Sequence, residues 1–102
     1  MKTQKRLRAS DVKSAIDLPT FYQNETGSVG RIHGVWQVAG LCPFHADTKP
    51  GSLNFHRETG RYLCFACDAK GTDVIDFLVN RDSSDFKTVL EYLAQNYGGG
   101  IS

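Results

Sequence analysis

Two short clusters of cysteine and histidine are the residues of this sequence best suited to chemistry. Cys42-Pro43-Phe44-His45 and Cys64-Phe65-Ala66-Cys67 follow the patterns C-x2-H and C-x2-C, with eighteen residues between them. Each cluster, or knuckle, presents two ligand atoms from one tight turn, and a hairpin between them would bring all four together. A Cys3His set is typical of structural zinc sites. The predicted ligands of one zinc ion are Cys42, His45, Cys64 and Cys67.

Other interpretations of these residues are weaker. Three buried cysteines and one core histidine would need paired knuckles to arise by accident, and His33 and His56 lie outside any such spacing. Four protein ligands leave no open position for substrate, so the metal is expected to be structural, with iron as the second candidate. Zinc deaminases carry H-x-E and P-C-x-x-C, but here Asp47 and Leu63 occupy the Glu and Pro positions.

The length of 102 residues predicts one small domain, whose marginal core a bound metal would stabilise. No signal peptide and no apolar run of membrane-spanning length are present, which together with three cysteines favours a cytoplasmic protein. The net charge is +4 over residues 1–13, +2 over residues 31–70 and −3 over residues 71–102. This asymmetry permits a polyanionic partner for the first two thirds.

Helices are expected on both sides of the knuckles. One short helix is predicted between Ser10, as N-cap, and Pro19, and residues 20–30 have the composition of a loop. After the second knuckle, helical periodicity predicts two more helices, capped by Thr72 and by Ser84, the latter ending at Gly98. Their expected core residues are Val74, Ile75, Phe77, Leu78, Phe86, Val89, Leu90, Leu93 and Tyr97.

Strands are expected between these helices. Residues 31–41 alternate as one half-buried strand, with Ile32, Trp36 and Val38 on its apolar face. Residues 53–57 and 61–64 are predicted to form a hairpin that ends at the second knuckle. The expected fold is α+β, with a zinc-ribbon-like antiparallel β-sheet, flanking helices and one structural zinc. Residues 10–97 would form this single domain, between a flexible basic tail (1–9) and a Gly-rich flexible end (98–102).

Beyond the ligand spacing, residues 35–80 resemble the CHC2-type zinc-binding domain of bacterial DnaG-type DNA primases. The family pattern runs C-P-F-H, a Thr-Pro-Ser-Phe-like segment, Y-x-C-F-x-C and G-D-x-I-x-F-L. The matching segments are Cys42-Pro43-Phe44-His45, Pro50 and Ser52, Tyr62-Leu63-Cys64-Phe65-Ala66-Cys67, and Gly71-Thr72-Asp73-Val74-Ile75-Asp76-Phe77-Leu78. The resemblance implies a domain that engages single-stranded template and helps a catalytic domain to start a primer.

The departures from this pattern spare the metal ligands. They include Lys49 in place of Thr, Gly51 as a one-residue insertion, Leu53 in place of Phe, and Ala66, Asp68 and Thr72 where Gly is common. These differences bear on which template sequence is recognised. The family places a polymerising domain after the zinc domain, and no segment beyond residue 80 is long enough for one. The chain is therefore expected to be a fragment or a free-standing relative, such as a phage or mobile element encodes, without catalytic activity of its own.

Two main functions are consistent with these residues. The first is a module that binds single-stranded DNA and supports primer synthesis in replication, with a primase or polymerase catalytic domain or a helicase as partner. Such modules combine cations with aromatic stacking platforms. The candidate DNA contacts are Lys49, Arg57, Arg61, Tyr62, Lys70, Trp36 and Phe55. The alternative is a zinc-ribbon adaptor for a replication protein, without DNA binding. A redox switch that releases zinc is less favoured, because structural sites are usually inert.

Overall fold

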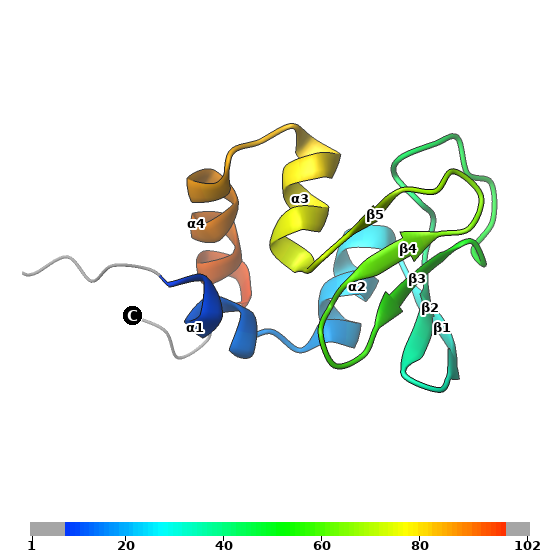
Figure 1. The fold of residues 1–102 in the computed structure, drawn as a ribbon, viewed down its shortest axis with the longest axis horizontal. Helices are drawn as coiled ribbons and strands as arrows, with labels where there is room; N and C mark the ends of the chain where they lie inside the picture. The colour runs from blue at the N-terminus through cyan, green and yellow to red at the C-terminus, as the bar shows by residue number, and fades with distance from the viewer. Residues whose placement is uncertain (1–7, 98–102) are drawn as a thin grey trace, which may run out of the picture.

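The structure is a computed structural model that describes residues 8–97. The predicted Gly-rich end (98–102), including the helix stop predicted at Gly98, lies outside the described residues. The predicted basic tail (1–9) also lies outside them, except for Arg8 and Ala9. The helices (Figure 1) are α1 (Ala9–Ser14), α2 (Leu18–Thr26), α3 (Val74–Asp82) and α4 (Phe86–Tyr97). The strands are β1 (Val29–His33), β2 (Trp36–Ala39), β3 (Leu53–His56), β4 (Tyr62–Cys64) and β5 (Lys70–Gly71). None of the helices formed by residues 8–97 is long and apolar enough to span a bilayer.

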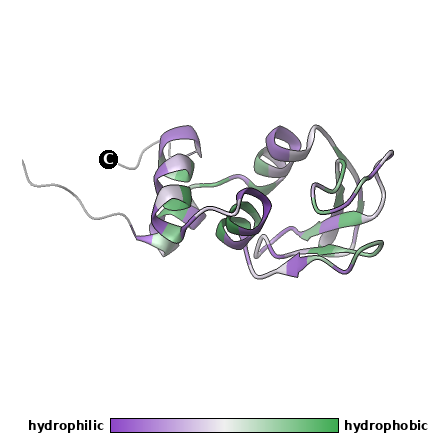
Figure 2. Cartoon of the chain, turned by 90° about the horizontal axis from the view of Figure 1, so that it is seen from above, coloured by the Kyte–Doolittle hydropathy of each residue, from purple (hydrophilic) through white to green (hydrophobic). Residues whose placement is uncertain are grey.

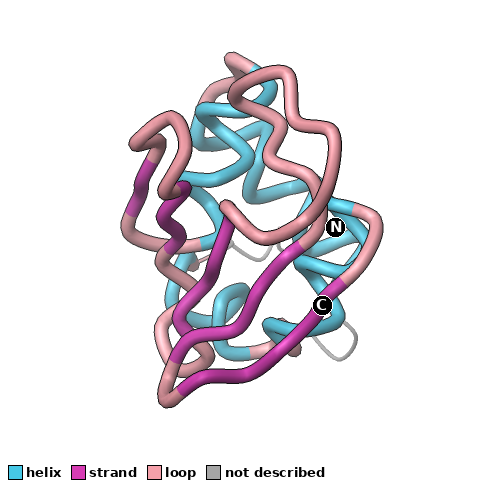
Figure 3. The backbone as a smooth tube through the Cα atoms, turned by 90° about the vertical axis from the view of Figure 1, so that its right-hand side faces the viewer, coloured by secondary structure: helices cyan, strands magenta, loops and turns pink. Residues whose placement is uncertain are grey.

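The five strands form one antiparallel sheet in which every strand pairs with its sequence neighbours, in the order β1-β2-β3-β4-β5. The helices lie behind the strands in Figure 3. The inner face of the sheet packs on them and carries the buried residues Leu53, Phe55, Tyr62 and Cys64. The outer face carries Trp36, Val38, Asn54, His56, Leu63 and Lys70. The predicted α+β fold, an antiparallel sheet with flanking helices, is confirmed.

Aromatic rings join the helices to the inner face of the sheet. Four rings surround Phe77 of α3 nearly edge-on, with centroids 5.1, 5.2, 5.6 and 6.0 Å away, from Tyr62, Tyr22, Phe44 and Phe21. Tyr22 of α2 also stacks on Phe55 of β3 at 4.4 Å. Its hydroxyl donates to the Gly60 carbonyl at 2.7 Å, so its buried polar atom is satisfied. Figure 2 shows the helices alternating between apolar and polar residues, as amphipathic packing requires.

One carboxylate ties three helices together. Glu25 of α2 accepts hydrogen bonds from the hydroxyls of Tyr92 (2.7 Å) and Tyr97 (2.6 Å) in α4, and pairs with Arg81 of α3 at 2.8 Å. Burial raises the pKa of Glu25, but the hydrogen bonds from Tyr97, Tyr92 and Arg81 outweigh it and hold the pKa below its usual value. The ionised carboxylate therefore stabilises the packing of α4 on the rest of the domain.

The prediction of a loop over residues 20–30 is wrong, because helix α2 occupies Leu18–Thr26. Asp17 caps this helix by accepting a hydrogen bond from the Thr20 amide at 3.2 Å. Pro19 lies in the first turn, where its missing N–H has no intrahelical partner to lose. Gly27 ends the helix with a φ of 100°. Pro19 thus marks the start of one helix rather than the limit of the preceding one.

The single strand expected over residues 31–41 is a hairpin of β1 and β2. Gly34 and Val35 form its turn, and the φ of Gly34 is 67°, as two-residue hairpin turns require. The assigned apolar face is also wrong, because Ile32 is exposed and Trp36 is only partly buried, on the outer face.

Gln37 takes the buried place that the alternation assigned to apolar side chains. Its amide donates to the Gly30 carbonyl at 3.0 Å and accepts from Arg57 Nε at 3.4 Å. Burying an amide costs little free energy when both of its ends are hydrogen-bonded. The polarity of Gln37 was therefore a poor guide to which face of the strand is buried.

The predicted helix caps are displaced, by two residues at α1, where Arg8 is the N-cap, and by one residue at α3 and α4. Ser10 lies inside α1 rather than before it. Asp73, not Thr72, caps α3 by accepting a backbone N–H at 2.9 Å. Asp85, not Ser84, accepts a backbone N–H at 2.8 Å at the start of α4. Since Ser, Thr and Asp have similar capping preferences, neighbouring candidates cannot be ranked from sequence.

Candidate metal centre and the outer face of the sheet

Two knuckles bring the four predicted ligands together. Cys42 and His45 lie in the turn after β2, whereas Cys64 ends β4 and Cys67 lies in the turn that follows. All four ligand atoms lie within 4.8 Å of one another. Cys42 Sγ is 3.9 Å from Cys67 Sγ, and Cys64 Sγ is 3.8 Å from His45 Nδ1. A tetrahedron built on Zn–S bonds has edges of about 3.8 Å, so these residues fit a single zinc ion.

Backbone amides surround the sulfur atoms. The Phe44 N–H points at Cys42 Sγ from 3.4 Å. Burial raises the pKa of the Cys42 thiol to about 12. Burial also raises the pKa of Cys64, but hydrogen bonds from the Cys67 and Ala66 amides outweigh it and lower that pKa. Thiolates are the form that binds zinc, so metal binding must displace a proton from Cys42 at neutral pH. The bound ion would complete a closed, structural shell that holds the two knuckles together.

Asp47 lies behind the first knuckle. Its Oδ2 accepts a hydrogen bond from the Cys42 amide at 2.9 Å, and its Oδ1 lies 3.6 Å from His45 Nε2. Because His45 Nδ1 faces the sulfurs, Nε2 is the nitrogen that faces this carboxylate. Carboxylates in that position fix the tautomer and orientation of a metal-bound histidine. This role of Asp47 was not predicted from the sequence, where the residue was considered only as a substitute for a catalytic Glu. The available signal was its two-residue spacing from His45.

We expect Asp47→Asn to weaken zinc binding by about 10–100-fold, because the histidine loses its charged partner. The measurement is competition against a chromophoric chelator. Asp68→Asn is the matched control, since Asp68 is an exposed carboxylate beside the second knuckle with a left-handed φ of 63°, which Asn also tolerates. Equal zinc affinity of Asp47→Asn and wild type would limit Asp47 to capping the Cys42 amide.

Two predicted DNA contacts lie in the core. Phe55 is 0% exposed and stacks on Tyr22, and Tyr62 is 2% exposed and stacks on Phe44 at 5.5 Å. The Tyr62 hydroxyl accepts a hydrogen bond from Asn80 at 2.8 Å. Neither ring offers a free face, so their prediction as stacking platforms is wrong. The physical reason is that both side chains lie on the inner face, which the helices cover.

Three other predicted contacts share one groove. Trp36, Arg61 and Lys70 line a hollow of about 490 Å³, and the nearly buried Tyr62 also contributes to its lining, as do Leu63 and Asp76. Register explains this grouping, because Trp36 pairs with His56, the His56 amide donates to the Arg61 carbonyl, and Leu63 pairs with Lys70. Within the five strands no residue is Asp or Glu. The Asp76 carboxylate at the groove wall accepts a hydrogen bond from the Thr72 amide at 3.0 Å.

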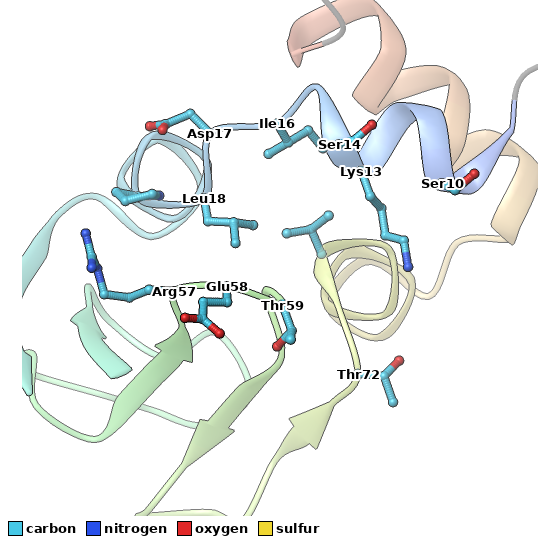
Figure 4. Close-up of a pocket in the computed structure, with 12 residues that line it drawn as sticks. Ser10, Lys13, Ser14, Ile16, Asp17, Leu18, Arg57, Glu58, Thr59 and Thr72 are labelled. Atoms are coloured by element: carbon cyan, nitrogen blue, oxygen red, sulfur yellow. The ribbon is translucent and has the colours of Figure 1, made fainter. Parts of the chain in front are cut away.

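The remaining two predicted contacts are placed elsewhere. Lys49 is exposed in the loop between the first knuckle and β3. Arg57 bonds Gln37 of the inner face and lines a cleft of about 750 Å³ between the start of α2, the β3–β4 loop and the start of α3 (Figure 4). Across that cleft, Lys13 pairs with Asp73 at 3.0 Å. Arg57 and Arg61 therefore serve different surfaces.

A closed four-ligand site on a short antiparallel hairpin defines a structural zinc ribbon. The family model described as CHC2 zinc finger matches residues 12–102. The chain belongs to the CHC2 zinc finger family, which confirms the resemblance, the zinc ion and its four-residue ligand set as the cofactor site.

Curated relatives of this chain include DNA primases from several bacteria. This chain is 39% identical over 59 residues to the DNA primase of Borreliella burgdorferi, covering 58% of this chain and 11% of that protein. It is 43% identical over 53 residues to the DNA primase of Escherichia coli K12, covering 52% and 9%. It is 35% identical over 69 residues to the DNA primase of Mycobacterium bovis, covering 68% and 10%. The chain thus spans about a tenth of the length of these relatives.

The fold has a counterpart of known structure. The crystal structure of the Aquifex aeolicus primase, comprising zinc-binding and RNA polymerase domains, matches with a TM-score of 0.65 at 24% identity. The match covers 91% of this chain and 23% of that one. At this identity the likeness supports the fold, namely an antiparallel zinc-binding sheet with flanking helices.

Proposed function

We propose that this chain is a zinc-binding module of a DnaG-type primase system, and that it binds single-stranded DNA on the outer face of its sheet. In this role it would support primer synthesis by a catalytic domain and make no primers alone. The observation that carries the proposal is the shared groove of Trp36, Arg61 and Lys70. It places an aromatic ring and two cations on one open face.

The chemistry of the groove suits an unpaired polynucleotide. Arg61 and Lys70 are exposed and available to phosphates, and Trp36 offers an indole ring to an unstacked base. The ring is braced, because His56 packs against it at 5.3 Å in an edge-to-face arrangement. On the neighbouring strand His33 Nε2 donates to Asn54 Oδ1 at 2.9 Å. A platform held in this way loses little side-chain freedom when a base stacks on it.

Arg61 and Lys70 are expected to supply phosphate contacts. Replacing both with Ala should weaken binding at all sequences and flatten the slope of log affinity against log salt by about 1.4, or roughly 0.7 for each lost contact. The measurement is fluorescence anisotropy with a labelled oligothymidylate across a salt series, with zinc content determined in parallel. Zinc content should not change, because neither residue is a ligand.

Arg57→Ala is the matched control for charge, since Arg57 is also exposed but lies on the other side of the sheet. Its single charge loss should leave affinity and salt slope close to wild type. An equal slope for the double variant and wild type would move the binding surface away from the outer face. Wild-type protein that binds no single-stranded DNA at low salt would overturn the proposal in favour of the protein-adaptor alternative.

A further inference from the structure

Phe65 is the most exposed large apolar side chain among the described residues, at 67%. It lies within the second knuckle, between the ligands Cys64 and Cys67. The aromatic cluster of the core does not include it. An exposed phenyl ring gains nothing from folding by itself, since its apolar surface stays in water.

Phe65 is the first residue of the turn after β4, and extending the register of the strand by this one residue assigns its side chain to the outer face of the sheet. The Phe65 amide donates to the Ser52 carbonyl at 2.9 Å, which continues the β3–β4 ladder by one pair beyond Leu53 and Cys64. Side chains alternate along a strand, so Phe65 shares its face with Leu63 and Arg61. The open face therefore carries Trp36 near one end and Phe65 at the other.

Spacing along the sheet gives the distance between these two rings. Trp36 is level with His56, four residues along β3 from Ser52, and it lies two strands from Phe65. Strand rise and strand separation put the two positions about 16 Å apart. At a stacked rise of 3.4 Å this is about five nucleotide steps, and fewer for an extended strand.

We propose that Phe65 is a second stacking platform for single-stranded DNA, an inference that rests on the proposed function of this face. The strand runs over the sheet from Trp36 to Phe65, and one base stacks on each ring. Arg61 lies at the end of the face that carries Trp36. Lys70, on β5, pairs with Leu63 of β4, which lies midway between Arg61 and Phe65 along the chain. Phosphates between the two stacked bases therefore pass cations.

The electrostatics of this face favour a nucleic acid over an acidic or neutral protein surface. The strands contain cations and no carboxylates, and Lys49 is exposed in the loop before β3. The one carboxylate in the groove lining, Asp76, accepts a hydrogen bond from the Thr72 amide. Asp68, beyond Phe65 in the same knuckle, is the nearest acidic residue in sequence. Each base–aromatic stack contributes sequence-tolerant affinity, so two rings would set a minimum length of bound strand rather than a base sequence.

The predicted metal site would fix the backbone on which Phe65 is mounted. Its neighbours Cys64 and Cys67 are both zinc ligands, and the amides of Ala66 and Cys67 bond the Cys64 sulfur. With the backbone of the turn fixed by the metal, stacking of a base has to order only the side-chain torsions of Phe65. The zinc ion would thus act in DNA binding by holding a platform in place.

The test compares oligothymidylates of two to eight nucleotides. Trp36 is the only tryptophan, so quenching of its emission reports stacking at the first platform, and competition against a labelled strand gives affinity. Wild type should gain affinity steeply once the strand reaches both rings, at about four to six nucleotides. Phe65→Ala should bind the longer strands about 10–100-fold more weakly, corresponding to the loss of one stack. Its affinity for the shortest strands and its Trp36 quenching should match wild type.

Three variants sharpen the result. Phe86→Ala removes another exposed phenylalanine, 54% exposed on α4, and should change nothing. Phe65→Tyr keeps a stacking ring and should retain affinity and length dependence. Phe65→Leu keeps an apolar side chain without a ring face and should resemble Phe65→Ala. Zinc content and circular dichroism are measured for each variant. If Phe65→Ala loses zinc, the comparison of Phe65→Tyr with Phe65→Leu tests whether an aromatic ring is needed for DNA binding.

The possible outcomes distinguish failure of the proposed function from failure of the second platform. No binding of any strand by wild type would defeat the proposed function itself. Wild-type binding with an unchanged affinity and length profile in Phe65→Ala would overturn the second platform and leave the proposed function standing. Full affinity of Phe65→Leu would show that stacking is not involved. Unchanged DNA affinity together with lost binding to a primase catalytic core would assign Phe65 to a protein contact and likewise overturn the inference.

Discussion

Cys64→Ser is expected to leave the protein largely unfolded and unable to hold one zinc per chain. Cys64 is fully buried, ends β4 and faces the inner side of the sheet, so its loss removes one of four ligands at the point where the knuckles meet. In zinc-finger peptides a complete site contributes roughly 10–16 kcal/mol of apparent binding free energy. A domain of this size has a stability of about 5–15 kcal/mol in total, so the metal decides whether it folds.

Zinc content by elemental analysis and thermal melting followed by circular dichroism check this expectation. Wild type treated with a strong chelator should reach the same unfolded state as Cys64→Ser. The two kinds of histidine give a matched comparison, because His45→Ala should lose zinc whereas His33→Ala, outside the ligand set, should keep it. A Cys64→Ser protein with native zinc content and an unchanged melting curve would refute the metal's role.

Phe77→Ala should cost about 3–5 kcal/mol of unfolding free energy, the range for deleting a buried phenylalanine. Phe77 is fully buried and touches rings from α2, β4 and the first knuckle, as well as the Arg81 guanidinium at 5.8 Å. Its removal leaves a cavity where three parts of the fold meet. Because Phe44 lies between Cys42 and His45, the variant should also bind zinc more weakly.

Urea unfolding at saturating zinc measures the stability term, and chelator competition measures the zinc term. Phe86→Ala, with an exposed ring, controls for the loss of a phenylalanine and should change stability by no more than about 0.5 kcal/mol. A loss below 1 kcal/mol for Phe77→Ala would mean that the helices and the sheet are not stabilised by a common core.

The metal centre was predictable because its information is local. Cys42 and His45, like Cys64 and Cys67, are three residues apart, and a hairpin predicted from the sequence closes the distance between the pairs. The β3–β4 hairpin and the buried residues of α3 were predictable for the same reason, since periodicity and turn residues act over a few positions. The packing of elements that lie far apart in the sequence could not be predicted in this way.

Helix α2 shows one limit of local information. Asn24, together with Gly27 and Ser28 just after the helix, gave residues 20–30 the composition of a loop, although Phe21 and Tyr22 anchor the helix in the core. Tertiary burial of two aromatic residues outweighs weak local propensity. The orientation of the strands shows a second limit. Alternation groups Phe55 with Arg57 on one face, but only packing against the helices decides which face is buried. The assignment of Phe55 and Tyr62 to a DNA surface failed for this reason.

The strictly sequential order of the sheet bears on how quickly the protein reaches its native state. Every strand pairs with the next one along the chain, so no pairing waits for a distant segment. Low contact order of this kind favours rapid folding. The four ligands flank the β3–β4 hairpin, and hairpins form in about 1–10 microseconds. When that hairpin closes, it brings Cys64 and Cys67 level with the start of β3, so the first knuckle has only the short segment between His45 and Leu53 left to close before the ion is held. Metal capture in the nascent chain should therefore keep pace with the supply of zinc rather than with any slow rearrangement of the polypeptide.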